Sequence, residues 1–150
     1  MESRMIQTPI GWLTIWAEDE FLIRIDFGIK GQSNSCMSVL LDAEQQLCEY
    51  FARKRQQFDL SLRITGTEFQ RKVWTTLQQI PYGQVKSYGE IAAQIGNPKA
   101  CRAVGMANNR NPLPIVIPCH RVVGSNGRLV GYAGGISIKE ELLRLEGVRL

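Results

Sequence analysis

The sequence predicts an α+β protein in which strands dominate residues 1–65 and helices dominate residues 66–150. Apolar and polar residues alternate in the first part, as they do in half-buried strands. In the second part, Ser or Thr followed three residues later by Glu or Gln precedes apolar runs, as at helix starts. The net charge also changes, from −2 (7 Lys/Arg, 9 Asp/Glu) in the first part to +6 (11 Lys/Arg, 5 Asp/Glu) in the second. We therefore expect two domains that divide at residues 65 and 66.

The first domain is predicted to contain a β-hairpin, a helix and one more strand. Strand-forming residues, a cluster of charged turn residues and helically spaced apolar residues follow one another along this part of the chain. The predicted elements are a strand at 11–17, a turn at 18–20, a strand at 21–27, a loop at 28–38, a helix at 40–51 and a strand at 58–64. No pattern here points to catalysis, so we expect a structural role.

The second domain is predicted to be mostly helical, because it contains several helix-start signals. Glycines that can end helices follow at Gly96 and Gly147. The predicted starts are a capping box at Thr67 and Gln70, one at Ser87 and Glu90, a cap at Asn97 with Pro98 in the first position, and a capping box at Ser137 and Glu140.

Two short helices joined by residues 96–98 are typical of a helix-turn-helix. The second of them, predicted to run to about Asn108, is rich in small residues, with Arg102 as its long basic side chain. Small residues allow close approach to a shallow groove but read few base edges. Together with the basic charge of this domain, the pattern favours contact with nucleic acid that is independent of sequence.

Composition excludes several other classes of protein. No apolar run is long enough to cross a bilayer, and the first residues do not resemble a signal peptide, so we expect a cytoplasmic protein with reduced thiols and no membrane association. The four cysteines are scattered without a CxxC pair, and His120 is the only histidine. A zinc site is therefore not expected, and no other metal or cofactor is indicated.

Cys119 and His120 lie side by side after an apolar, proline-rich segment at 112–118. A thiolate is a strong nucleophile, and a neighbouring imidazole is the usual means of forming one near neutral pH. A cysteine–histidine pair can also be a small buried thiol beside an unrelated histidine. The pair alone leaves both interpretations open.

The surrounding residues resemble the active-site signature of the O6-alkylguanine-DNA alkyltransferases. The resemblance spans nearly all of residues 66–150 and is fainter before that, at Thr8-Pro9-Ile10-Gly11. The matching segments are Ala103-Val104-Gly105, residues 111–123 around Pro118-Cys119-His120-Arg121, residues 66–74, Tyr82-Gly83, Ser87-Tyr88, residues 96–100, residues 132–135 and residues 139–147.

This resemblance implies a ribonuclease H-like first domain and a winged-helix-like helix-turn-helix domain that binds DNA and accepts the alkyl group. It implies repair of double-stranded DNA by direct damage reversal. The protein would bind the minor groove, flip O6-alkylguanine out of the duplex and transfer the alkyl group irreversibly to Cys119. The sequence leaves O4-alkylthymine open as a second substrate. The free protein is expected to be monomeric.

The resemblance also assigns roles to individual residues. Cys119 is the acceptor, His120 the base acting through a water, Glu146 the residue that orients the imidazole, and Asn111 a hinge beside the active-site loop. The expected DNA contacts are Arg102, which fills the place of the flipped base, and Tyr88, Ser87, Ala103 and Gly105. The expected pocket for the base consists of Tyr132, Ala133, Val122, Asn108 and Tyr88.

Three other functions compete with repair. A non-catalytic binder of alkylated bases needs no reactive cysteine, and Cys119 is present. A thiol hydrolase or acyltransferase could use Cys119 and His120, but adjacent positions are atypical for those families and a basic helix-turn-helix has no evident purpose there. A transcription regulator is disfavoured by the small residues of its second helix.

Overall fold

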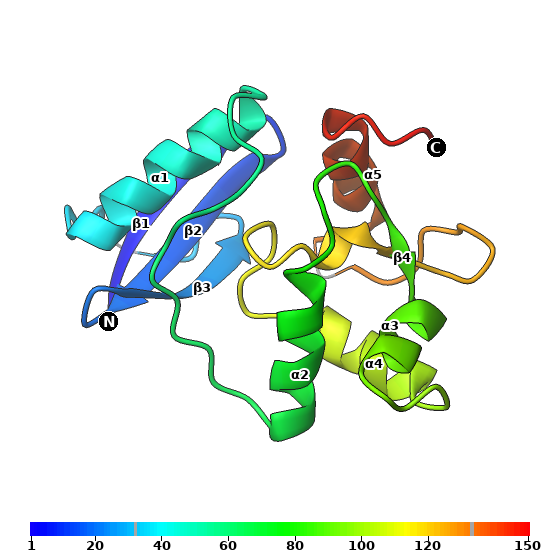
Figure 1. Ribbon diagram of the computed structural model, residues 1–150. Helices are drawn as coiled ribbons and strands as arrows, with labels where there is room; N and C mark the ends of the chain where they lie inside the picture. Colours follow the sequence, from blue (N-terminus) through cyan, green and yellow to red (C-terminus); the bar gives the residue numbers. More distant parts are fainter. Residues whose placement is uncertain (32, 133) are drawn as a thin grey trace. The chain divides into compact units, whose positions relative to one another are not determined.

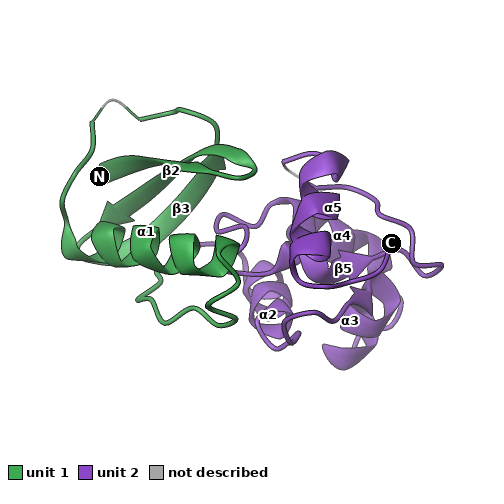
Figure 2. Ribbon diagram, turned by 90° about the horizontal axis from the view of Figure 1, so that it is seen from above, with its two compact units in different colours: residues 1–64 green, residues 65–150 purple. Residues whose placement is uncertain are grey.

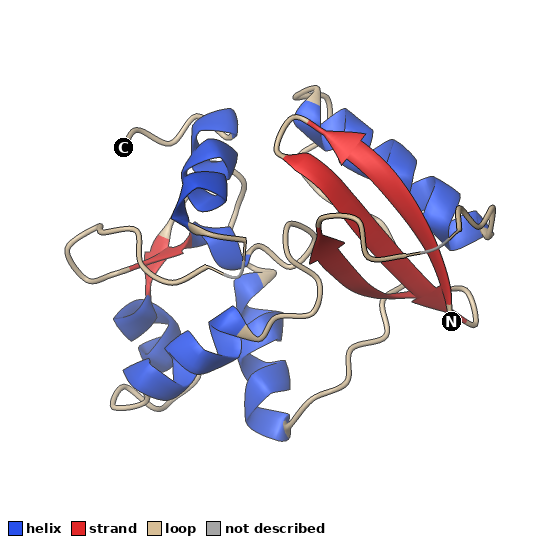
Figure 3. Cartoon of the chain, turned by 180° about the vertical axis from the view of Figure 1, so that it is seen from behind, coloured by secondary structure: helices blue, strands red, loops and turns tan. Residues whose placement is uncertain are grey.

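The first 64 residues form a compact unit, and residues 65–150 form a second one (Figure 2). The computed structural model describes residues 1–31, 33–132 and 134–150. Helices and strands are distributed as an α+β protein requires, with most strands in the first unit and most helices in the second (Figure 3). No helix of the described residues is both long and apolar enough to cross a membrane.

The first unit contains a three-stranded antiparallel sheet in the order β1-β2-β3, formed by Glu2–Thr8, Gly11–Glu18 and Phe21–Phe27. Asp19 and Glu20 join β2 to β3 with φ of 52° and 63°, as a two-residue turn of type I′ requires. The predicted hairpin is confirmed. The sequence pattern does not reveal β1, because this edge strand buries only Ser3 and Ile6 and shows little alternation.

Helix α1 (Ser38–Phe51) packs against this sheet (Figure 1). Its buried face presents Leu40, Leu47 and Tyr50, and the apolar core of the sheet includes Leu13 and Ile15. The predicted helix is confirmed. The strand predicted at 58–64 is wrong, since only Leu62 forms an isolated bridge, with Leu22. The alternating apolar side chains are half-buried, but the backbone of this segment does not pair with a strand beyond that bridge.

The second unit consists of α2 (Glu68–Leu77), β4 (Lys86–Ser87), α3 (Tyr88–Gln94), α4 (Cys101–Asn109), the 3-10 turn η1 (Cys119–Arg121), β5 (Val122–Val123) and α5 (Ile136–Leu145). Strands β4 and β5 pair in parallel. The indole Nε1 of Trp74 donates to the carbonyl of Ala107 at 2.8 Å and so joins α2 to α4. Helices α3 and α4 pack together in the predicted helix-turn-helix.

Two predicted capping boxes are confirmed. Thr67 accepts from the backbone of Gln70, whose side chain accepts from the backbone of Thr67, and Ser87 and Glu90 do the same at α3. Gly96, with φ of 85°, ends α3: its N–H bonds to Ala93 and that of the next residue bonds to Ala92, which is a Schellman motif.

Two other predicted caps are wrong. Helix α4 starts at Cys101 after Ala100 and has no side-chain cap, because residues 97–100 form a separate turn. Helix α5 starts one residue before Ser137, after Gly135 with φ of 95°, so Ser137 lies inside the helix and caps nothing. Both segments contain residue types that favour caps, but the helices start at other positions, after Ala100 and Gly135.

The capping box of α2 predicts a measurable loss of stability. Thr67 is exposed, so Thr67→Ala should remove the cap with little change in packing and lower the free energy of unfolding by about 1 kcal/mol. Urea unfolding measures this change. Ser38→Ala is the control, because Ser38 is also exposed at a helix start but caps nothing. Equal stability losses in the two variants would contradict the assignment.

Candidate active site

Cys119 is held by a short turn between two fixed segments. Its N–H donates to the carbonyl of Ile117 at 2.7 Å, and the N–H of Arg121 donates to the carbonyl of Pro118 at 3.0 Å. The following residue, Val122, enters β5 and pairs with Lys86. The side chain is only 2% exposed. The predicted nucleophile therefore lies inside the second unit, with its backbone position fixed on both sides.

Asn111 ties the end of α4 to the segment that leads to Cys119. Its Nδ2 donates to the carbonyl of Ile117 at 2.8 Å, and its Oδ1 accepts from the N–H of Leu113 at 2.9 Å. Between these points Ile115 has φ of 76°, a left-handed conformation that is uncommon for a β-branched residue. Asn111 thus holds a tight turn directly before the thiol.

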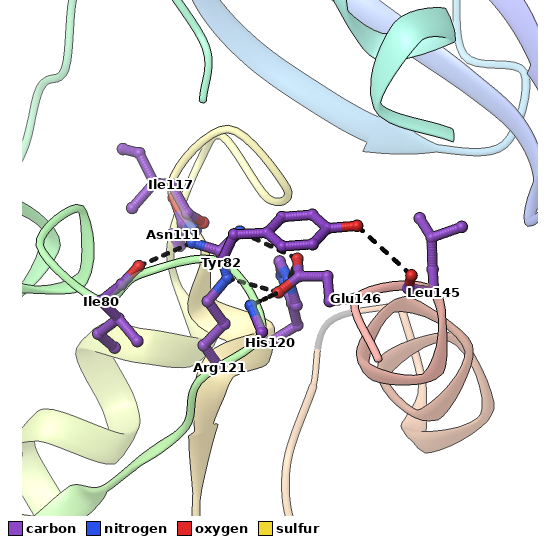
Figure 4. A network of polar contacts seen from close by, with 9 residues as sticks. Ile80, Tyr82, Asn111, Ile117, His120, Arg121, Leu145 and Glu146 are labelled. Atoms are coloured by element: carbon purple, nitrogen blue, oxygen red, sulfur yellow. Dashed lines mark hydrogen bonds and ion pairs between the residues drawn. The ribbon is translucent and has the colours of Figure 1, made fainter. Parts of the chain in front are cut away.

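Glu146 is the centre of a buried polar network (Figure 4). Its Oε2 lies 2.7 Å from Nε2 of His120, and both side chains are buried. Arg121 donates to the same carboxylate through Nε at 2.8 Å and Nη2 at 3.0 Å. The N–H of Gly83, whose φ is 78°, adds a bond of 3.1 Å to Oε1. Three separate segments of the unit therefore meet at one carboxylate.

The network fixes the protonation states of its members. Burial alone would raise the pKa of Glu146, but the hydrogen bonds from His120 and Arg121 outweigh burial and hold that pKa far below its usual range. Burial lowers the pKa of His120, so the imidazole is neutral near pH 7. Because a carboxylate only accepts, Nε2 of His120 carries the proton. The buried Nδ1 is then a basic nitrogen, and it has no hydrogen-bond partner among the described residues.

The thiol itself is protonated in the resting protein. Burial raises the pKa of Cys119 to about 11, although Asn111, Lys139 and Tyr132 each lower it in part. No hydrogen bond joins its sulfur to His120 within the described part of the chain. Removal of the thiol proton by Nδ1 would therefore need an intervening water.

Several predicted pocket residues surround Cys119. Nδ2 of Asn108 donates to the backbone carbonyl of Cys119 at 3.4 Å. Tyr88 donates its hydroxyl to the carbonyl of Val130 at 3.1 Å, and burial followed by the charge of Cys119 raises its pKa. Val122 and Tyr132 are buried. The predicted contact at Ala133 lies outside the described residues.

The predicted DNA-binding residues lie mainly on α4 and are accessible. Arg102 and Ala103 are exposed and Gly105 is half-buried. Arg102 makes no hydrogen bond or ion pair within the described part of the chain. Ser87 caps α3, and its hydroxyl already accepts a bond from Glu90.

Sequence reasoning assigned no role to two buried basic residues. Arg121 is 6% exposed, also donates to the carbonyl of Ile80 at 2.8 Å and lies over the ring of Tyr82. Lys139 is 0% exposed. The sequence does contain a sign that Lys139 is buried, because helical spacing places it on the same face as Leu142 and Glu146. A lysine in the apolar stripe of a helix is unusual.

Comparison with known proteins gives consistent matches over the whole chain. The family model described as "6-O-methylguanine DNA methyltransferase, ribonuclease-like domain" matches residues 1–64. The model described as "6-O-methylguanine DNA methyltransferase, DNA binding domain" matches residues 68–148. The first of these descriptions agrees with the ribonuclease H-like fold that the sequence predicts for the N-terminal part.

Individual relatives match over nearly their full lengths. A methylated-DNA–protein-cysteine methyltransferase of Methanosarcina acetivorans is 48% identical over 98% of this chain and 99% of its own. A constitutive one of Bacillus subtilis is 45% identical over 95% and 93%. The crystal structure of Mycobacterium tuberculosis OGT in complex with DNA has a TM-score of 0.89 and 44% identity, covering 98% of this chain and 93% of that one.

The buried carboxylate predicts a pH-dependent stability difference. Glu146→Gln leaves Arg121 without its counter-charge, so the free energy of unfolding at pH 7 should fall by about 3–5 kcal/mol. The carboxyl pKa is lower in the folded than in the unfolded protein, so its stabilisation is present above about pH 4.3 and is lost as the pH falls further. The difference between wild type and variant should shrink in acid.

Urea unfolding from pH 7 to pH 3 measures this difference. Glu141→Gln is the matched control, since Glu141 is exposed on the same helix and should have little effect at any pH. A difference for Glu146→Gln that stays constant with pH would contradict the assignment of a buried, ionised Glu146.

Proposed function

This chain belongs to the 6-O-methylguanine DNA methyltransferase family, and we propose that Cys119 is the residue that accepts the alkyl group. The enzyme class is that of the methylated-DNA–protein-cysteine methyltransferases, which repair DNA by alkyl transfer. The observation that carries the assignment of Cys119 is its neighbour, a buried neutral His120 whose Nε2 is bonded to Glu146 at 2.7 Å and whose Nδ1 is left basic.

The proposed reaction begins with the thiol proton. A water passes it from Sγ of Cys119 to Nδ1 of His120, and Glu146 stabilises the imidazolium. The thiolate attacks the carbon bound to O6 of guanine. As the new sulfur–carbon bond forms, the carbon–oxygen bond breaks and its electron pair moves to the guanine. The guanine anion then gains a proton and the imidazolium of His120 loses one through water, which restores the unmodified base and the neutral ring.

The proposed product explains single use. Cys119 becomes a thioether, and an unactivated carbon–sulfur bond gives water no good leaving group. Each protein molecule would therefore repair one lesion and then remain inactive.

The proposed substrate is double-stranded DNA, bound by the second unit in its minor groove. The net charge of +6 over residues 66–150 supports contact with phosphates. The exposed surface of α4 offers small residues and Arg102, which suits close approach to a shallow groove. The reactive carbon cannot meet a buried sulfur while the base is stacked, so we include rotation of the nucleotide out of the duplex.

Within this proposal, each remaining site residue has a defined task. Arg102 occupies the space that the flipped base leaves, while Ala103 and Gly105 allow α4 to approach the groove. Tyr88 and Ser87 face the target nucleotide at the start of α3. Tyr132, Ala133, Val122 and Asn108 line the base pocket, and the first unit serves stability. We further propose that one monomer acts on one lesion.

Mass spectrometry of the intact protein tests the acceptor. After incubation with a duplex containing one O6-methylguanine, the protein should gain the mass of one methyl group, located on Cys119 by peptide mapping. Cys119→Ala should gain none. Cys101→Ala is the matched control, because its thiol is exposed on α4 and should be dispensable. A methyl group on any other cysteine would overturn the proposal.

The same experiment separates the competing functions. Tight binding with an unchanged mass would favour a non-catalytic binder, and an unchanged mass without binding would favour a thiol hydrolase. A parallel duplex containing O4-methylthymine determines whether that base is also a substrate.

Arg102→Ala tests the proposed extrusion of the base. Since unstacking a base costs a few kcal/mol, loss of the wedge should slow transfer from duplex DNA by about tenfold or more. Transfer from the free base O6-methylguanine should keep its rate. Arg110→Ala is the control, because Arg110 is an exposed cation at the end of the same helix. Equal slowing by both variants, lost at high salt, would reduce Arg102 to a phosphate contact.

A further inference from the structure

Lys139 is buried in the second unit without an opposite charge beside it. It lies on α5 and is 0% exposed. Its Nζ donates to the carbonyl of Val130 at 3.0 Å, and no carboxylate of the described residues lies within ion-pair distance of it. A buried ammonium group without a counter-ion is costly. A core position of this kind would normally hold an apolar side chain, so the lysine needs an explanation.

The charges around Cys119 add up to an excess of one positive charge. Glu146 and Arg121 form a buried ion pair and cancel. His120 is neutral because burial lowers its pKa. Burial raises the pKa of Tyr88, which also lies near the thiol, so this phenol is uncharged near pH 7. Lys139 is therefore the unbalanced charge, and ionisation of Cys119 would place a negative charge on η1, the turn against which α5 packs.

Lys139 and Cys119 influence each other's pKa in the direction expected for an ion pair. Burial lowers the pKa of Lys139 to about 8, while Cys119 acts to raise it. In return, Lys139 is one of the groups that lower the pKa of Cys119 against the effect of burial. Lys139 still carries its charge at pH 7, so the charge is present when the reaction takes place.

We propose that Lys139 is the counter-charge of the Cys119 thiolate, a buried cation that is already in place when the nucleophile ionises. The ammonium group keeps its proton throughout, and the thiol proton still leaves through water to His120. As the carbon–oxygen bond breaks, the negative charge passes from sulfur to guanine and remains near the ammonium. This last step rests on the proposed alkyl transfer, whereas stabilisation of the thiolate does not.

The hydrogen bond to Val130 also links Lys139 to Tyr88. The carbonyl of Val130 accepts both Nζ of Lys139 and the hydroxyl of Tyr88, at 3.0 and 3.1 Å. Loss of Lys139 could therefore act by displacing Val130 and Tyr88 rather than by removing a charge. The experiment has to distinguish these two effects.

The pH dependence of Cys119 alkylation by iodoacetamide, followed by peptide mapping without DNA, makes this distinction. Lys139→Met removes both the charge and the hydrogen bond, whereas Lys139→Gln removes the charge and keeps a donor for Val130. In both variants Cys119 should react about tenfold or more slowly near pH 7, where Lys139 of the wild type carries its charge. Exposed Cys101 in the same molecule is the internal control and should be unaffected.

Three outcomes would overturn the inference. The first is an unshifted Cys119 profile in both variants. The second is rescue by Gln but not by Met, which would assign Lys139 a hydrogen-bonding role alone. The third concerns the titration of Lys139 itself, followed by NMR at its ε-carbon in protein that keeps this lysine. We expect Lys139 to titrate at lower pH in Cys119→Ala than in wild type. An identical titration would exclude the coupling even if the Lys139 variants fail to fold.

The proposed function can fail separately from this inference. If Lys139 variants change the reaction of Cys119 with iodoacetamide but no methyl group is transferred from DNA, the pairing of Lys139 with the thiolate is supported. The proposed repair activity of Cys119 is then contradicted. If methyl transfer to Cys119 occurs while the profile is unchanged, the reverse holds.

Discussion

The carboxylate of Glu146 is the interaction on which the second unit depends. It receives hydrogen bonds from the η1 turn through His120 and Arg121 and from the loop after α2 through Gly83. An anion at the C-terminal end of a helix is opposed by the helix dipole, and burial adds a larger cost. Several donors with good geometry, including the charged Arg121, are needed to offset these costs. The position of His120, and with it the chemistry of Cys119, is thus set by the same contacts that hold the unit together.

Acceptance of the thiol proton and stabilisation of negative charge are two tasks that an imidazole alone would have to combine. Glu146 and Arg121 neutralise each other and orient His120, so the ring stays neutral and ready to accept a proton. Lys139, from the same helix as Glu146, contributes a charge that no carboxylate of the described residues cancels. In the mechanism we propose, different residues therefore remove the proton and stabilise the negative charge.

Local signals predicted the elements whose geometry depends on few residues. The capping boxes at Thr67 and Ser87 and the glycine at position 96 are complete within about ten residues, and the structure has them as predicted. The strand at 58–64 and the cap at Ser137 fail because their outcome depends on a distant partner or on where the chain bends. The contacts of Arg121 and Lys139 join residues more than eight positions apart, and no local pattern specifies them.

The turn before Cys119 has a consequence for conformational entropy. Pro112, Pro114 and Pro118 restrict the unfolded chain, and Asn111 holds Ile115 in a left-handed conformation that a free peptide would avoid. The freedom of this segment is therefore lost when the protein folds and not when a substrate binds. When a substrate binds, this segment therefore has little conformational entropy left to lose, and the sulfur is already positioned for reaction.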